Sequence, residues 1–531
     1  MAKRKLFVSG LENDLKQSKL AKTESRVHLG KLSDEALLLI FSHLNSSDLA
    51  KCASTCKRWN LLANDSLVWK RLFYTTFIES RIPSGTQSRS RIEENWLRRS
   101  RKNEPDRKWK ALYKLRHNWH RGRCSIDEID VTRLSSPAKA ATTSSAGEIN
   151  NGFDEDSIFR FYGHHIFAID AELGVSAWDT SGQMLVSEQL PSHHSHQRYS
   201  GEDYGLVSCV NIYSDSESSD NCCSLTLAVG YTNGGFALLG FQAGASTTRL
   251  DLLHVYNPEH KQSSIKKIAY ERPFVITLSV DNRINIYQYR DQEDAVERRP
   301  DLLSSLQSIA IKGPTSLSAR KLATSDLVIA TIAYAHQSLV SGWTVAVQEI
   351  QLDKDAGLVN LRSASSCIAE SEIGFSLSPP LVSLRNMPAG RAFSNEMLMP
   401  PTSLSYAHPF LVTSHADNTL VSYLVKSTML ELTVTPGVRL WGHTSGVANV
   451  KVKDRGKAVS ISATGNEIRV WNLEPYSIGK LQDVKGVKIS SQENTPSAEM
   501  QLGEYFGFDD EKVVVEKVQE KRKSLMIYDF T

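Results

Sequence analysis

The chain has 531 residues, a formal net charge of +3 and 40% hydrophobic residues. At about 150 residues per domain it is too long for one ordinary domain, and its composition is that of a folded protein. The small charge gives no argument for nucleic acid, and no apolar run approaches the roughly 18 residues of a membrane span. The seven cysteines follow no fixed spacing and the start, MAKRKLFVSG, lacks the apolar core of a secretory signal, so we expect a reducing compartment.

The first 28 residues are polar and basic. They include Lys3-Arg4-Lys5 close to the start of the chain. We expect residues 1–28 to form a solvated tail. A nuclear-import role for the basic cluster stays open, so we expect a cytoplasmic or nuclear localisation, or both.

Residues 29–75 predict three short helices with an apolar face. Ser33 can cap the first helix, and Asp34 and Glu35 suit its positive end. Asn45 to Asp48 breaks this helix and starts a second one, and Asn64-Asp65 opens a third. The apolar positions recur at helical spacing: Leu37, Ile40, Phe41 and Leu44 in the first helix; Leu49, Cys52, Ala53 and Cys56 in the second, which ends near Arg58-Trp59; Leu67, Val68, Trp69, Leu72 and Phe73 in the third.

This stretch resembles an F-box, the helical module that docks on a Skp-type adaptor in cullin–RING ubiquitin ligases. The residues that carry the likeness keep the family order and spacing: Leu32-Ser33-Asp34-Glu35, Leu37, Ile40, Leu44, Asp48-Leu49, Lys57-Arg58-Trp59 and Trp69-Lys70. Ser33 stands where the family usually has proline and Ala36 where it usually has isoleucine, which would soften the adaptor contact without removing it. An ordinary helical bundle with an aromatic core is the alternative. The resemblance implies an adaptor contact by these residues: Leu32, Leu37, Ile40, Leu44, Leu49, Trp59 and Trp69.

Residues 76–122 are interpreted as a basic helical linker. Ile82 to Gly85 predicts a loop in its first part. Trp109 to Tyr113 and Asn118-Trp119 resemble the linker that F-box proteins carry before a WD-repeat propeller. A nucleic-acid patch is the competing interpretation, but aromatic residues on a helical stripe suit packing better than base stacking. The residues expected to pack back on the F-box helices recur at helical spacing: Trp109, Leu112, Tyr113 and Arg116.

Residues 123–531 predict many short strands, because apolar runs alternate with clusters of Gly, Asn, Asp and Ser. Residues 268–289 match residues 404–425 almost position for position, and residues 447–473 have the same shape. The repetition predicts a WD-repeat-like β-propeller of seven blades, with six or eight blades and a β-sandwich array as alternatives. Four weaker copies complete the seven units: 158–180, 224–241, 327–352 and 505–530.

Two of these units carry the marks of a WD repeat. The segment from Leu440-Trp441-Gly442-His443 to Val470-Trp471-Asn472 resembles one repeat well, with Trp-Asn in place of the usual Trp-Asp. Val175 to Asp179 is a second such ending, with Gly163-His164 unusually close above it. A WD unit ends on the third strand of a blade, so the last unit would lack an outer strand. We expect Arg123 to Ile129 to pair beside it and close the ring.

The sequence shows no convincing catalytic constellation. It lacks the G-x-S-x-G, G-x-x-x-x-G-K-[ST], H-E-x-x-H and paired C-x-x-C motifs, so we expect no enzyme activity and no cofactor. Cys52 and Cys56 stand one turn apart, as zinc ligands can, but a place on a buried stripe favours core packing. His193, His194 and His196 form a histidine-rich loop, which we interpret as solvated rather than metal-binding.

A multidomain chain of this kind, an α-helical F-box and linker followed by an all-β propeller, resembles an F-box/WD-repeat substrate receptor of an SCF-type ubiquitin ligase. The resemblance implies a Skp-type adaptor and, through it, a cullin–RING ligase as partners. It also implies a protein substrate, often phosphorylated, read by arginines; Arg283, Arg439 and Arg469 are our candidates. We expect no nucleic acid or membrane partner. Two other classes stay open: a scaffold that binds the adaptor without a degradation role, and a hydrolase with its site among the propeller loops.

Overall fold

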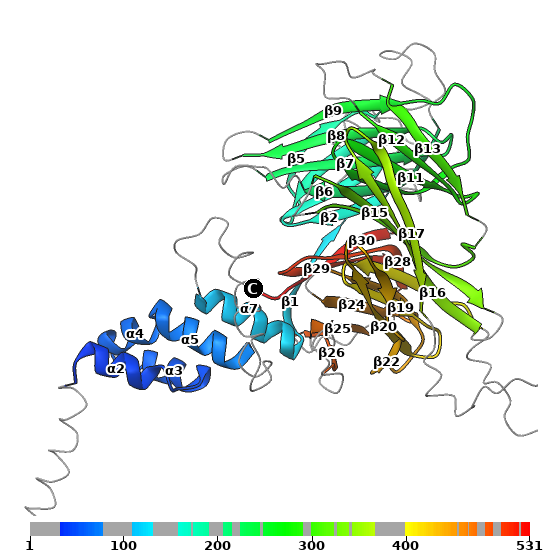
Figure 1. The fold of residues 1–531 in the computed structure, drawn as a ribbon. Coiled ribbons are helices and arrows are strands. Elements are labelled where there is room, and N and C mark those ends of the chain that lie inside the picture. Colours follow the sequence, from blue (N-terminus) through cyan, green and yellow to red (C-terminus); the bar gives the residue numbers. More distant parts are fainter. Residues whose placement is uncertain are drawn as a thin grey trace, which may run out of the picture. The chain divides into compact units, whose positions relative to one another are not determined.

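A computed structural model describes the greater part of the chain, and it divides into two compact units, Met1–His117 and Asn118–Thr531. Figure 1 draws the first helices in blue and the strands from cyan to red. The predicted tail, the histidine-rich loop and much of the linker lie outside the described residues. The described residues are 32–77, 109–130, 158–170, 174–190, 205–214, 223–244, 248–289, 299–308, 310–322, 326–338, 342–366, 399–453, 456–465, 467–474, 484–491, 501–519 and 522–531.

Residues 32–77, the first described part of the first unit, form four short helices. Ser33 caps the first of them as predicted, because its hydroxyl accepts a hydrogen bond from the Ala36 amide at 3.3 Å. Asn45 caps the second, with the Asp48 amide 2.9 Å from its side-chain oxygen. Each cap satisfies a backbone donor that the first helical turn leaves without a partner. The helices are α2 (Asp34–Phe41), α3 (Ser46–Ala53), α4 (Lys57–Ala63) and α5 (Ser66–Phe77).

Helices α3 and α4 are separate where the sequence predicts a single helix that reaches Trp59, so that prediction is wrong. The hydroxyls of Ser54 and Thr55 donate to carbonyls in the last turn of α3, which satisfies acceptors that a continuing helix would otherwise use. Cys56 then takes an extended backbone as the residue before α4 and is exposed. It is therefore not on a buried stripe, contrary to the prediction, whereas Cys52 is half-buried.

The core of the first unit is largely aromatic. The linker helix α7 (Trp109–Arg121) contributes Tyr113 to it, which confirms the predicted packing of that stripe on the F-box helices. The Tyr113 ring meets that of Trp69 edge-on at 5.4 Å, and the Arg116 guanidinium lies 5.5 Å from the Phe73 ring centre. The buried core comprises Phe41, Leu49, Ala63, Val68, Trp69, Leu72, Phe73, Phe77 and Tyr113.

The second unit is a propeller of seven sheets, as predicted, and its sheets consist mainly of strands consecutive in the chain (Figure 1). Blade 1 has β2 (Ile158–Tyr162), β3 (His165–Asp170), β4 (Gly174–Asp179) and β5 (Met184–Glu188). Blade 2 has β6 (Val207–Ser214), β7 (Cys223–Tyr231), β8 (Phe236–Ala243) and β9 (Thr248–Tyr256). Blade 3 has β10 (Ile265–Glu271), β11 (Phe274–Ser279), β12 (Arg283–Gln288) and β13 (Asp301–Gln307).

The other four blades follow the same plan. Blade 4 has β14 (Thr315–Lys321), β15 (Val328–Ser338), β16 (Gly342–Asp353) and β17 (Gly357–Ser365). Blade 5 has β18 (Ser403–Ala407), β19 (Phe410–Ser414), β20 (Thr419–Ser427), β21 (Leu432–Val434) and β22 (Val438–Trp441). Blade 6 has β23 (Val447–Val452), β24 (Lys457–Ser462), β25 (Ile468–Asn472) and β26 (Gly486–Lys488). Blade 7 has β28 (Gln501–Phe508), β29 (Lys512–Gln519), β30 (Arg522–Asp529) and β1 (Arg123–Asp130), with the short β27 (Ser490–Ser491) beside β1.

Five of the seven predicted repeats coincide with the first three strands of a blade. The repeats at 224–241 and 327–352 start one strand late and miss β6 and β14. Both missed strands carry polar residues that interrupt the apolar pattern. In β6, for example, Ser208 and Asn211 donate hydrogen bonds to carbonyls of the neighbouring blade, those of Ile265 and Ile268. Polar side chains that join blades thus conceal a strand from a search for apolar runs.

The predicted closure of the ring is confirmed. Strand β1 pairs antiparallel with β30, from Ser125 opposite Asp529 to Asp130 opposite Ser524. The residue after β30, Phe530, stacks on Trp119 with ring centres 3.9 Å apart. An early segment therefore covers the outer edge of the last blade, an edge that would otherwise be free to pair with other chains.

The first strand of each blade is the innermost one. These strands surround the axis of the ring and are neighbours in the order β28, β2, β6, β10, β14, β18 and β23. The turns between second and third strands, such as Asp281-Asn282 and Asp417-Asn418, lie on one face, which we call the upper face. Asn282 and Asn418 have φ values of 60° and 68°, a conformation that asparagine tolerates better than most residues. Within the described residues, no helix is long and apolar enough to cross a membrane.

Candidate functional site

Helices α2 and α4 of the first unit present large apolar side chains to solvent. Leu39 is 61% exposed, Ile40 44% and Leu61 75%. The two helices lie side by side, and the Arg58 guanidinium of α4 contacts the Asp34 carboxylate of α2 at 2.7 Å. Exposed apolar side chains of this size on neighbouring helices are typical of a surface that binds another protein.

The seven residues predicted to bind the adaptor fall into two groups. Leu37, Leu49 and Trp69 are only 1%, 1% and 6% exposed, and the Trp69 indole nitrogen donates to the Ala63 carbonyl at 2.8 Å. These three side chains hold the helices together and offer almost no surface to a partner. The accessible group contains Ile40, which is exposed, and three half-buried residues, Leu32, Leu44 and Trp59.

A depression of about 500 Å³ lies beside Leu61, at the junction of α3 and α4. Its other lining residues are small or polar: Ala53, Ser54, Cys56, Lys57 and Asn60. No group of three or more His, Cys, Asp or Glu side chains that could hold a metal ion occurs in the described part of the chain. A depression lined by an apolar side chain together with polar groups can receive a side chain of a protein partner.

The three arginines predicted to contact a substrate are all near the upper face of the propeller, on three different blades. Arg439 is paired with Asp417 at 3.3 Å and its side chain is 41% exposed. Arg469 is bound more tightly, to Glu467 at 2.6 Å and to the Gly486 carbonyl at 3.0 Å, and is 16% exposed. Arg283 lies 3.9 Å from Asp281, with a side chain that is 50% exposed.

Two of these arginines are close to the segment that carries an exposed tryptophan. Trp441 ends β22 and is 67% exposed, two residues after Arg439. The next residue, Gly442, approaches Arg469 so closely that a Cβ atom there would lie 3.1 Å from an Nη1 nitrogen. Arg283 is in blade 3 and does not belong to this group. Exposed tryptophan beside arginine is the composition typical of a protein interaction hot spot.

The WD-like unit around Trp471 contains a buried polar network. The His443 imidazole is 2.6 Å from the Ser460 hydroxyl, to which the Trp471 indole nitrogen donates at 2.8 Å. Burial raises the pKa of Glu467, but hydrogen bonds from the Thr444 amide and hydroxyl and from Arg469 outweigh it and lower the pKa to about 2. This network stabilises the segment that contains Trp441.

The other WD ending has a different environment. Gly163-His164 forms the hairpin turn between β2 and β3, whereas Gly442-His443 precedes the first strand of its blade. Gly163-His164 is close in sequence to Val175–Asp179 because it belongs to this hairpin and does not precede the blade. The Trp178 indole nitrogen donates to the Ser176 hydroxyl at 3.0 Å, whereas the hydroxyl that receives the Trp471 indole nitrogen also contacts the His443 imidazole. Only the segment before β23 therefore has the arrangement that the sequence suggested for both.

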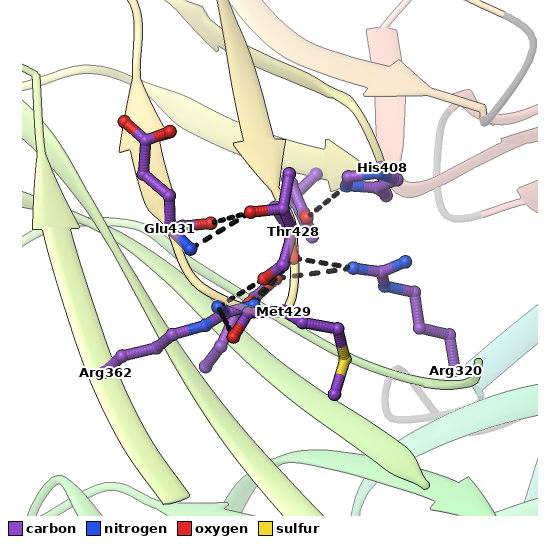
Figure 2. A network of polar contacts seen from close by, with 9 residues as sticks. Arg320, Arg362, His408, Thr428, Met429 and Glu431 are labelled. Atoms are coloured by element: carbon purple, nitrogen blue, oxygen red, sulfur yellow. Dashed lines mark hydrogen bonds and ion pairs between the residues drawn. The ribbon is translucent and has the colours of Figure 1, made fainter. Parts of the chain in front are cut away.

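Two other arginines do converge, between blades 4 and 5. Arg362 and Arg320 contact the fully buried Glu349 carboxylate at 2.6 Å and 3.4 Å. Figure 2 shows the same arginines directed at the loop that contains Thr428 and Met429, whose carbonyls accept hydrogen bonds from Arg362 at 2.5 Å and 3.5 Å. A carboxylate already occupies the centre of this cluster, so it holds two blades together rather than forming an open anion site.

Sequence reasoning missed Leu39, Leu61 and Trp441 as surface residues. One signal for Leu39 was available, because Leu37, Leu38, Leu39 and Ile40 are consecutive and a helix cannot turn four consecutive residues toward one core. Trp441 carried no such signal, since it reads as part of a WD motif.

Comparison with known proteins agrees with this architecture. Residues 34–75 match the F-box-like family, and residues 124–531 match the family described as F-box protein pof12 beta-propeller. The F-box protein pof12 of Schizosaccharomyces pombe is 23% identical over 453 residues, which cover 83% of each chain. An F-box protein of Saccharomyces cerevisiae is 28% identical over 113 residues, 18% of each chain. A solved structure of U3-55K covers 69% of this chain and is itself covered to 92%, with 11% identity and a TM-score of 0.37.

The fold and the two family matches define an F-box protein with a β-propeller. F-box proteins generally act in SCF ubiquitin ligases, where the F-box implies binding to a Skp-type adaptor, and those with propellers are typically receptors rather than enzymes. The chain belongs to the F-box protein pof12 beta-propeller family.

Proposed function

We propose that this chain is the substrate-recognition subunit of an SCF-type ubiquitin ligase. In this role the F-box docks on a Skp-type adaptor and the propeller captures the protein to be ubiquitinated. The observation that carries the proposal is the exposed apolar surface of Leu39, Ile40 and Leu61, on the unit that matches the F-box-like family. Catalysis then belongs to partner subunits, and this chain contributes proximity and orientation.

The upper face of the propeller is the proposed substrate surface. Arg439 and Trp441 are accessible there, and blade 6 holds their segment through Arg469. Arg283 remains a separate candidate on the same face. If the substrate is phosphorylated, the accessible arginines would supply charge-assisted hydrogen bonds, and binding would weaken as salt is added.

The adaptor contact is tested with the double variant Leu39→Asp/Ile40→Asp in the full chain. Both side chains are exposed, so the charges should leave the helical core intact and remove adaptor co-purification by at least tenfold. The matched control is Leu430→Asp, since Leu430 is 99% exposed but lies in the propeller. Unchanged co-purification of the adaptor with a folded double variant would contradict the F-box role.

The same variant separates a receptor from a scaffold. A receptor that cannot reach its ligase should retain its substrates, so proteins captured by the double variant should accumulate in cells and become ubiquitinated when the wild-type chain is restored. Captured proteins whose abundance and ubiquitination do not change would favour the alternative, a scaffold that binds the adaptor without a degradation role.

A further inference from the structure

The outer edges of several blades are protected against pairing with other strands. In blade 7, β27 pairs with the outer side of β1, where Ser490 lies opposite Arg123. In blades 5 and 6, strands β21, β22 and β26 have only three or four residues each. Strand β9 of blade 2 is longer, but it carries Arg249 and Asp251, which form an exposed ion pair at 3.2 Å. An added strand, a short strand and exposed charges all prevent unwanted pairing at the edge of a sheet.

Strand β17, the outer strand of blade 4, has none of these three forms of protection. It is nine residues long, contains no proline, and has Arg362 as its only charged residue. The Arg362 side chain is 13% exposed, contacts the Glu349 carboxylate of its own blade at 2.6 Å and is directed at the loop that contains Met429 (Figure 2). Of the strands that the structure describes, only β16 pairs with β17. A long edge without exposed charge is prone to pair with another strand.

The exposed apolar side chains of β17 lie on one face of its sheet. Leu361 is opposite Ile350 of β16, and Leu358 is opposite Leu352. Opposed residues share a face, and Ile350 and Leu352 both belong to the core shared with blade 3. Val359 is the extra residue of a register shift and is two residues from Leu361, so it lies on the same face. Leu358, Val359 and Leu361 are 40%, 52% and 45% exposed.

The register shift in β17 does not distinguish it from other outer strands. The outer strand pairs of blades 1, 2 and 3 also have such a shift. In β9 the extra residue is Leu253, which is 38% exposed. The shift is therefore a common feature of these blades, and β17 differs in its length, its apolar face and its lack of exposed charge.

We propose that the outer edge of β17 pairs antiparallel with the same edge of a second copy of this chain, about a two-fold axis at Leu361. In this register Leu361 lies opposite its own counterpart, Val359 opposite Ser363, and Asn360 opposite Arg362. The exposed apolar side chains of both copies then lie on the same face of one continuous sheet. Both copies bury the same surface, as the copies in a closed dimer do.

The sequence of β17 favours a second copy in this register. A two-fold axis at Arg362 would place two like charges opposite each other, which destabilises a strand pair. An axis at Ser363 would place Leu361 opposite Ser365, and an axis at Asn360 would reach the register shift after one residue on each side. The axis at Leu361 pairs residues 359–363 and brings leucine against leucine. It also keeps the two arginines apart, and each is already bound to Glu349 of its own blade.

The test measures the oligomeric state of the full chain by analytical ultracentrifugation over a wide range of concentration. We expect the wild type to shift from monomer to dimer as its concentration rises. Leu361→Lys should weaken dimerisation at least tenfold, because it places two positive charges opposite each other. The matched control is Leu253→Lys, which makes the same change at an exposed leucine of the outer strand β9 and should dimerise as the wild type does. Melting curves check that both variants are folded.

Two further variants test the register. Leu361→Glu alone should be as monomeric as Leu361→Lys, whereas an equal mixture of the two should dimerise again, because opposite charges then face each other. Leu361→Cys should form a disulfide-linked dimer under mild oxidation. Leu358→Cys should not exceed the wild-type background, because residue 358 and its counterpart are about 20 Å apart along the paired strands.

Three outcomes would overturn the proposal. A wild type that is monomeric at every concentration would mean that another segment of the chain or a different protein covers this edge. Dimerisation of Leu361→Lys equal to that of the wild type would place the interface elsewhere. A mixture of the lysine and glutamate variants that stays monomeric would contradict the two-fold register. Adaptor co-purification should be the same for all these variants, so the result is independent of the proposed function.

Discussion

The propeller contains two groups of converging cations that differ in one respect. Between blades 4 and 5, Arg320 and Arg362 share the buried Glu349 carboxylate. On the innermost strands, desolvation and then the charge of Arg160 lower the pKa of both Lys267 and Lys451, and the charge of Lys267 lowers that of Lys451 further. The first group surrounds a buried carboxylate, whereas in the second group desolvation is the largest cause of the lowered pKa of both lysines.

This difference separates a cluster that holds two blades together from lysines whose protonated form the protein disfavours. A buried carboxylate between two arginines satisfies the donors of both and leaves little for a ligand. Loss of contact with water and neighbouring positive charges both disfavour the protonated form of a lysine. Convergence of basic residues is therefore insufficient evidence for an anion site.

The largest expected effect follows from removing the carboxylate of the first group. Glu349→Ala should destabilise the propeller by about 3–5 kcal/mol, the usual cost of leaving partners of a buried ion pair uncompensated. Chemical unfolding followed by tryptophan fluorescence measures this. The control is Glu431→Ala, which removes an exposed carboxylate 3.6 Å from Lys426 and should change stability by less than about 1 kcal/mol.

A triple replacement sharpens the same test. Glu349→Met with Arg320→Met and Arg362→Met removes all the charges together, and well-packed apolar substitutes for a buried ion pair are often neutral. We therefore expect the triple variant to be more stable than Glu349→Ala. If it is less stable, the arginine bonds to the Thr428 and Met429 carbonyls contribute more than the charge pair does.

Removing a charge from the second group should change stability in the opposite direction. Lys451→Met removes a desolvated cation from a repulsive environment, so the melting temperature should rise by a few degrees in buffer without phosphate or sulfate at pH 6. The methionine can keep the contact with the Phe506 ring, whose centre lies 5.6 Å from the lysine nitrogen. A fall in melting temperature would show that the environment favours the charged lysine, and the comparison of the two groups would then fail.

The sequence predicted the fold because the fold is repetitive. Matched units at 268–289 and 404–425 predicted blades 3 and 5, and the segment left over before the first unit predicted the closing strand β1. Where polar side chains join neighbouring blades, as in β6, the apolar pattern failed. The break between α3 and α4 was missed because the Ser54 and Thr55 hydroxyls end a helix while the apolar spacing continues.

The candidate surfaces could be predicted only in part. Helical spacing placed Leu37 and Ile40 on one stripe, but it could not show that one is 1% exposed and the other 44%. That difference depends on which neighbouring helix covers each residue. The effect of Lys267 on the pKa of Lys451 could not be predicted at all, since the two residues belong to separate blades and interact only in the folded ring.

The smallest expected effect is a dependence of stability on pH that belongs to Lys451. Its pKa is about 7 in the folded chain and ordinarily 10.5, so between these values the unfolded chain binds more protons. Stability should therefore rise as the pH increases from 7 to 9, and Lys451→Met should flatten this rise. Unfolding curves at pH 6, 7, 8 and 9 measure this effect. Equal slopes for the wild type and the variant would show that the lysine is not under repulsion at the axis.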